Sequence, residues 1–167
     1  MLSTIKVIFF VQVFCSLFIF SIATSNEEIA IEIDNPKFSE KGLDDKIYEI
    51  KADKGIKFAN NLKLFIIEGK FKTENGTWIY LKADEGTYNQ DSNIIELNKN
   101  INFYTDEQES LESDMAIFYI SKDIIEFYDN VRHLTENTIV TSNNSKVINN
   151  FNNISYEGDV FTKFKKN

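Results

Sequence analysis

The chain has 167 residues, which is enough for one domain and a leader. Its formal net charge is −8 at pH 7, and no basic stripe offsets the acidic residues, which argues against a nucleic-acid binder. The single cysteine, Cys15, lies within an apolar segment, so the rest of the chain offers neither a disulfide nor thiolate chemistry.

The first 25 residues have the character of a leader. An uncharged run of 17 residues, from Val7 to Ala23, follows Lys6. As a helix at ~1.5 Å per residue this run extends ~25 Å, slightly less than the ~30 Å hydrocarbon core of a bilayer. A cleaved signal peptide and a retained single-pass helix both fit the pattern, and both take residues 26–167 out of the cytoplasm.

The part after the leader repeats one pattern. Its units start at Ala52, Ala83, Ser113 and Ser142, which are 31, 30 and 29 residues apart. The three later units have two small residues three positions apart, an apolar or aromatic residue, a polar turn, an apolar-x-apolar pair, a polar pair and a β-branched residue. The copy from Ala52 is looser, with Gly55, Leu64, Ile66 and Gly69 in place and its aromatic residue at Phe58. A fixed period of this kind indicates a repeat architecture, and each unit predicts a strand, a turn and a returning strand.

Small residues hold the first and fourth place of each unit, as at Ala83 and Gly86. We expect them at corners, where two backbones approach closely and a larger side chain would not fit. Apolar residues alternate with polar ones along 29–33, 48–52 and 79–83, with turn residues between these segments. The pattern predicts one all-β domain over residues 26–167, a sandwich or a roll.

Signatures of catalysis are weak. His133 is the only histidine, and nothing in the pattern places its sequence neighbours Ser121, Asp129 and Thr135 around it. We interpret His133 as a surface or groove residue without a catalytic role.

Aspartates recur at the second place of three units, at Asp53, Asp84 and Asp114. Their neighbours do not form the Gly-rich, Asp-rich loops of calcium-binding repeats, so we interpret them as solvated positions beside a turn. The sequence predicts a protein that is not an enzyme and holds neither a cofactor nor a metal.

Large apolar residues recur at the inward positions of the units. One interpretation is an ordinary dry core, and the other is an open roll whose interior is a groove for lipid chains. The residues assigned to this groove are Ile50, Leu64, Ile66, Ile79, Leu81, Ile95, Leu97, Ile101, Phe103, Phe118, Ile125, Phe127, Val131, Ile154 and Tyr156.

Four segments after the apolar leader occur in an order that resembles the LptC family of lipopolysaccharide-export proteins, within the wider group that shares OstA-type β repeats. They are D-N-P-K-F-S at 34–39, Y-E-I-K-A-D-K-G at 48–55, W-I-Y-L-K-A-D-E-G-T-Y at 78–88 and I-I-E-L-N-K-N-I-N-F at 94–103. The resemblance covers residues 28–165, and the order and spacing of the segments carry it.

This resemblance implies an open β-jelly-roll of ~30-residue strand-turn-strand repeats in the periplasm, preceded by one N-terminal transmembrane helix in the inner membrane. In the family, the domain accepts lipopolysaccharide from an inner-membrane ABC transporter permease complex and passes it to a periplasmic bridge protein of like fold. The implied docking strands are 29–39 for the permease side and 154–163 for the bridge. The resemblance also favours retention of the segment 1–25 as a membrane anchor.

Two alternatives stay open. One is a soluble lipopolysaccharide-bridge protein of the same fold, released when the leader is cleaved. The other is a β scaffold with a dry core that binds no lipid. A carbohydrate-active enzyme would need two carboxylates facing one cleft, and the sequence offers no such pair.

Overall fold

The computed structural model describes residues 30–42, 46–73, 76–107, 109–148, 151 and 153–165. The strands are β1 (Ile31–Asp34), β2 (Lys37–Lys41), β3 (Ile47–Phe58), β4 (Asn61–Lys72), β5 (Trp78–Asn89), β6 (Ile94–Thr105), β7 (Ser110–Tyr119), β8 (Ile124–Leu134), β9 (Thr138–Ile148), β10 (Asn153–Glu157) and β11 (Phe161–Phe164), with the 3₁₀ turn η2 (Ile120–Lys122) between β7 and β8. The predicted anchor, residues 1–25, lies outside the described ranges. Within those ranges no helix is long and apolar enough to cross a membrane.

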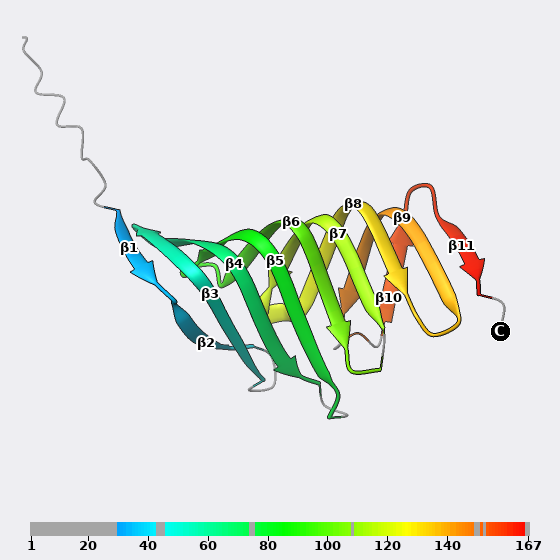
Figure 1. Ribbon diagram of the computed structural model, residues 1–167, viewed down its shortest axis with the longest axis horizontal. Helices are drawn as coiled ribbons and strands as arrows, with labels where there is room; N and C mark the ends of the chain where they lie inside the picture. Colours follow the sequence, from blue (N-terminus) through cyan, green and yellow to red (C-terminus); the bar gives the residue numbers. More distant parts are fainter. Residues whose placement is uncertain are drawn as a thin grey trace, which may run out of the picture.

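The 11 strands belong to one antiparallel sheet, in which β3 to β9 follow one another in chain order (Figure 1). At one edge β1 and β2 both pair with β3, and at the other edge β10 and β11 both pair with β9. The two edges do not pair with each other, so the sheet is not closed. The all-β prediction is confirmed, and a single folded sheet supplies both of its layers.

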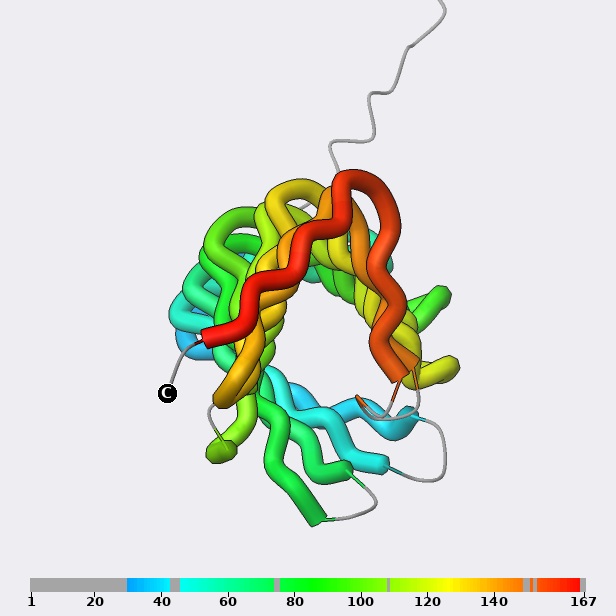
Figure 2. The backbone as a smooth tube through the Cα atoms, turned by 90° about the vertical axis from the view of Figure 1, so that its right-hand side faces the viewer, coloured from blue at the N-terminus to red at the C-terminus, as the bar shows by residue number. Residues whose placement is uncertain are grey.

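The long strands bend near their middle, so the sheet folds over and surrounds an apolar interior (Figure 2). The bend in β5 is visible in its burial pattern, because Ile79, Leu81 and Ala83 are buried in strict alternation and Gly86 follows after a step of three residues. In a flat strand alternate residues face alternate sides, so this step turns the inward face through a corner.

Two kinds of corner alternate along the sheet. In β3, β5, β7 and β9 the inward step is three residues and both ends of the step are small. In β6 and β8 the step is four residues, and the extra length is taken up by two left-handed residues, Lys99 with Asn100 and Asp129 with Asn130, at φ between 51° and 67°. Asn and Asp tolerate this conformation better than most residues, which accounts for the polar pair of the repeat.

At Gly86 the small corner residue is required by close backbone contact. A Cβ added to Gly86 would lie 2.8 Å from Ile67 Cδ1 and 2.9 Å from the backbone oxygen of Glu96. The expectation that small residues mark close approaches is confirmed at this corner.

Side-chain hydrogen bonds also join neighbouring corners on the outer surface, and we call each such pair of residues a clasp. Asn100 Nδ2 donates to Asp84 Oδ2 at 2.7 Å, and Asn130 Nδ2 donates to Asp114 Oδ2 at 2.6 Å. In the last unit the two residue types are exchanged, since Asn143 Nδ2 donates to Asp159 Oδ2 at 3.3 Å. Each pair is 16 residues apart in the chain, so the aspartates at the second place of two units hold the same clasp.

One predicted inward residue is misplaced. Ile66 is 60% exposed and has a left-handed φ of 55°, whereas its neighbour Ile67 is 1% exposed. The prediction placed Ile66 inward because it follows the inward residue Leu64 by two positions. The corner of β4 lies between Leu64 and Ile67, and it shifts the inward positions by one residue.

We expect Gly86→Ala to lower the free energy of unfolding by ~1–3 kcal/mol, because its Cβ would meet a backbone oxygen that cannot move cheaply. The matched control is Gly69→Ala in β4, where the nearest atoms to an added Cβ are at 3.3 and 3.4 Å, and we expect a loss of less than ~1 kcal/mol. Urea unfolding followed by circular dichroism measures both values. Equal losses at the two positions would contradict the corner explanation.

Candidate functional site

The interior of the folded sheet is the first candidate site. Most of the residues assigned to the groove are at most 4% exposed: Ile50, Leu64, Ile79, Leu81, Ile95, Leu97, Ile101, Phe103, Phe118, Ile125, Phe127 and Val131. Ile154 and Tyr156 are partly buried on β10, and Ile66 lies outside. These side chains share one face, but their contact with lipid stays a prediction.

Sequence reasoning missed inward residues that lie beyond a corner or in a turn. Tyr48, Ile67, Phe71 and Leu111 are each at most 3% exposed, and so is Ile120 in η2. Tyr48 already belongs to the apolar face predicted for 48–52 and is absent only from the residues assigned to the groove, and Phe71 could have been found two residues after the small residue Gly69. No periodic signal marks Ile120, because it lies outside the strands.

The interior is filled by its own side chains in this conformation. The Phe103 ring on β6 meets Phe127 on β8 edge-on, with centroids 5.3 Å apart, and Tyr48 on β3 meets Phe118 on β7 in the same way at 5.0 Å. These contacts join the two halves of the folded sheet. An acyl chain can therefore enter only if the two halves separate or the rings rotate away.

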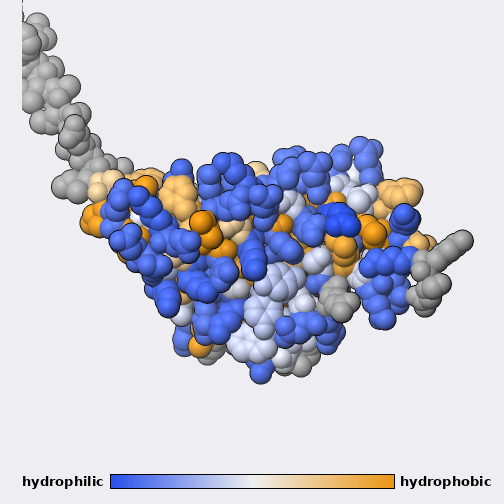
Figure 3. All heavy atoms as spheres, viewed as in Figure 1, coloured by the Kyte–Doolittle hydropathy of each residue, from blue (hydrophilic) through white to orange (hydrophobic). Residues whose placement is uncertain are grey.

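The inward face continues to both free edges of the sheet. On β1, Ile31 pairs with Lys57 two residues along from the Ile33–Gly55 pair, and its side chain is 56% exposed. On β11, Phe164 pairs with Thr138 and is 76% exposed. Hydrophobic surface is visible at both ends of the long axis in Figure 3.

The edge strands are also free to pair. β1 and β2 have β3 on one side, and β10 and β11 have β9 on one side, with no further strand of the described chain beyond them. A free edge presents unpaired backbone groups, to which a strand of another protein can add. Val160 and Phe161 add exposed apolar surface next to the C-terminal edge.

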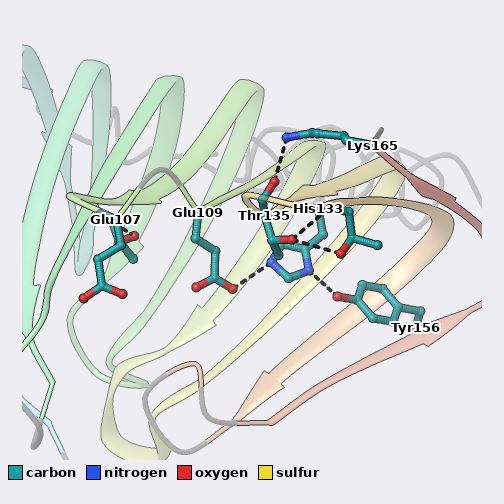
Figure 4. A network of polar contacts seen from close by, with 8 residues as sticks. Glu107, Glu109, His133, Thr135, Tyr156 and Lys165 are labelled. Atoms are coloured by element: carbon teal, nitrogen blue, oxygen red, sulfur yellow. Dashed lines mark hydrogen bonds and ion pairs between the residues drawn. The ribbon is translucent and has the colours of Figure 1, made fainter. Parts of the chain in front are cut away.

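His133 lies at the centre of a polar cluster near that edge (Figure 4). Its Nε2 lies 2.8 Å from Glu109 Oε1, and its Nδ1 contacts the hydroxyl of Tyr156. Glu109 directly precedes β7 and Tyr156 lies on β10, whereas the residues that the sequence considered as neighbours of His133 were Ser121, Asp129 and Thr135. The imidazole is only 7% exposed, so His133 is a buried crosslink and not a surface residue.

The geometry of this cluster favours a structural role, in which His133 joins β8 to β10 and to Glu109, over nucleophilic chemistry. A neutral imidazole with its proton on Nε2 donates to the Glu109 carboxylate and leaves Nδ1 to accept from the Tyr156 hydroxyl. Burial, and secondarily the charge of Glu109, raises the pKa of Tyr156 to about 12. The phenol therefore stays protonated at neutral pH and supplies no oxyanion.

A groove of about 740 Å³ lies over β2 to β6, and it differs in character from the interior. Outward side chains such as Lys51, Glu68 and Tyr80 form its walls. Lys51 Nζ and Glu68 Oε2 are 2.6 Å apart, so these charges already satisfy each other. The groove therefore combines paired charges with aromatic side chains such as Tyr80 and Tyr104, unlike the uniformly apolar cluster of the interior.

No protein-family description matches the chain. The chain is similar to an uncharacterized protein of Rickettsia prowazekii (strain Madrid E), with 29% identity over 118 residues. The similar region covers 69% of this chain and 57% of the relative, so the chain spans little more than half of the relative's length.

Because the raised pKa of Tyr156 favours the neutral phenol in the folded state, its contribution to stability is complete below pH 10 and is lost as the pH rises through about 12. We expect Tyr156→Phe to weaken the fall in stability over this interval, measured as urea midpoints at pH 8, 10, 11 and 12. Tyr104→Phe is the control, because Tyr104 is a tyrosine on the outer face of β6. An unchanged alkaline slope in Tyr156→Phe would show that the phenol is not coupled to folding.

Proposed function

We propose that the chain is a lipopolysaccharide-transport protein whose interior receives the acyl chains of the lipid. The observation that carries this proposal is the largely apolar inner face of an unclosed sheet, which has exposed apolar side chains at both free edges, Ile31 at one and Phe164 at the other. In an ordinary dry core we would expect apolar side chains at the ends to be covered.

The energetics of lipid transfer favour such an interior. Each methylene group exposed to water costs ~0.8 kcal/mol, so a chain of ~12 carbons costs roughly 10 kcal/mol in water. A lipid with several chains therefore needs an apolar route between membranes. A folded sheet that is open on one side can shield the chains and leave a large polar headgroup outside.

The two free edges support a proposal about the partners. The β1–β2 edge would pair with the permease side of an inner-membrane ABC transporter, and the β10–β11 edge with a periplasmic bridge protein of like fold. Strand addition at both edges would align the interiors of neighbouring proteins. In this proposal the chain needs no nucleotide site or cofactor, because the partner ATPase does the work, and the open β-jelly-roll of the family is its architecture.

Photocrosslinking in cells tests the lipid contact. A photoreactive amino acid at Leu97, which is 0% exposed, should capture lipopolysaccharide, whereas the same probe at the adjacent outward Glu96 should not. Capture by the Glu96 probe alone would place lipid on the outer face and contradict the interior route. If neither probe captures lipid in a folded protein, the dry scaffold becomes the better interpretation.

The proposed inner-membrane localisation depends on residues 1–25, which lie outside the described part of the chain. We expect the mature protein to retain these residues as a single-pass anchor, so its N-terminal sequence should begin at or next to Met1 and the protein should remain in the membrane fraction after a high-salt wash. A mature N-terminus near Thr24 or Asn26 would instead identify the soluble bridge protein.

A further inference from the structure

The two halves of the folded sheet are joined in two different ways. On one side lie the corners, where every long strand passes from one half to the other and pairs with its neighbours on both sides of the bend. On the opposite side the halves end in turns, and we call this side the seam. Among the described residues no strand pairing crosses the seam, so the halves can separate there without breaking the ladder.

One polar cluster crosses the seam between β3 and the turn after β7. Lys46 Nζ donates to Asp123 Oδ2 at 2.7 Å, and the Tyr48 hydroxyl donates to Asp123 Oδ1 at 2.7 Å. The side chains of Lys46 and Asp123 are 8% and 7% exposed, so the ion pair is buried. The residues that it joins are 77 positions apart in the chain.

The turn that carries Asp123 is built to present this carboxylate. Asp123 has a left-handed φ of 52°, and its N–H donates to Ile120 O at 3.3 Å. The N–H of Ile120 donates in turn to Asn93 O at 3.2 Å, which ties the turn to the neighbouring strand connection. Lys46 therefore meets an acceptor whose position is fixed by the backbone.

The cluster lies directly over the aromatic interior. The Tyr48 ring is 4.9 Å from the Phe71 ring and 5.0 Å from the Phe118 ring, centroid to centroid. Burial raises the pKa of the Tyr48 phenol above its ordinary value, and the hydrogen bond to Asp123 and its charge add to this effect. Movement of Tyr48 with the seam would uncover the two phenylalanines beneath it.

We propose that the seam at Lys46, Tyr48 and Asp123 is the portal through which an acyl chain enters the interior, and that the buried ion pair is its closure. The inference rests on the lipid-carrier function proposed above. A buried ion pair suits a closure because its attraction is offset by the cost of removing both charges from water, and because it has a defined geometry that is either made or lost. An apolar contact of equal area would hold the halves together without this desolvation cost and without one defined geometry that is either made or lost.

The first test needs no lipid. Asp123→Asn keeps the shape and suits the left-handed backbone but removes the charge that Lys46 requires, so we expect the seam to open more often in the full-length protein in detergent micelles. Hydrogen exchange should be about tenfold faster in peptides covering 46–48 and 117–124, with no change in peptides covering the corners at 83–86 and 98–101. The matched control is Glu68→Gln, which neutralises one member of the exposed pair with Lys51 and should change neither region.

The second test uses purified lipid A and the photoreactive probe at Leu97. Asp123→Asn should increase the rate of capture about tenfold over the protein with Asp123, and Glu68→Gln should not change it. If Asp123→Asn does not fold, Tyr48→Phe serves instead, because it keeps the ion pair and loses one hydrogen bond, and it should accelerate exchange in the same peptides by a smaller factor.

The outcomes separate the two proposals. Faster exchange spread evenly over the whole domain, or an unchanged rate of capture despite local opening of the seam, would overturn the portal. Absence of capture in every form, with exchange still faster only at the seam, would overturn the lipid-carrier function and with it the portal, and would leave the ion pair as a local structural contact.

Discussion

The structure depends on the way in which its strands turn the corner. A flat strand of twelve residues could bury one face only against a second sheet, but these strands bend at the middle and bury that face against their own continuation. The bend uses two small inward residues three positions apart in β3, β5, β7 and β9, a pair of left-handed residues in β6 and β8, and the single left-handed residue Ile66 in β4. Adjacent strands use these two solutions alternately from β5 to β8, and the register shifts between them mark the corner in each pair.

This constraint explains why the sequence repeats and why its repeats are loose elsewhere. At Gly86 the chain has little choice, because a larger side chain would collide with the backbone oxygen of Glu96. At Asp84 and Asn100 the clasp needs one carboxylate and one amide but not a fixed order, and in the last unit Asn143 and Asp159 exchange these roles. Inward positions only need to be large and apolar, so Leu, Ile, Val, Phe and Tyr replace one another there.

The sequence alone was sufficient for the all-β class, the period and most of the inward face, because these features are local and recur. It was insufficient where the inward face shifts without a small residue to mark the shift, and Ile66 is the example. Contacts between distant segments were also beyond it. Nothing near His133 indicates Glu109 or Tyr156, and nothing near Lys46 indicates Asp123, since each partner is brought close only when the sheet folds over. The leader is consistent with two interpretations, and both concern residues outside the described part of the chain.

The corners and the seam together determine what the fold can do. The interior of this conformation is packed to a degree that stabilises a domain, with Leu97 and Phe127 fully buried, so a ligand has to displace side chains that pack against one another. Because each long strand runs through its corner and is paired on both sides of it, that displacement can be confined to the opposite side, where an acyl chain can pack against the apolar side chains that have separated. A closed barrel would have no such side, and a sandwich of two separate sheets would lack the covalent continuity that holds the halves in register. An unclosed sheet folded over on itself therefore combines a dry interior with a route into it. Each edge of the sheet is formed by two short strands, β1 with β2 and β10 with β11, and these edges leave the route open to a neighbouring protein at both ends.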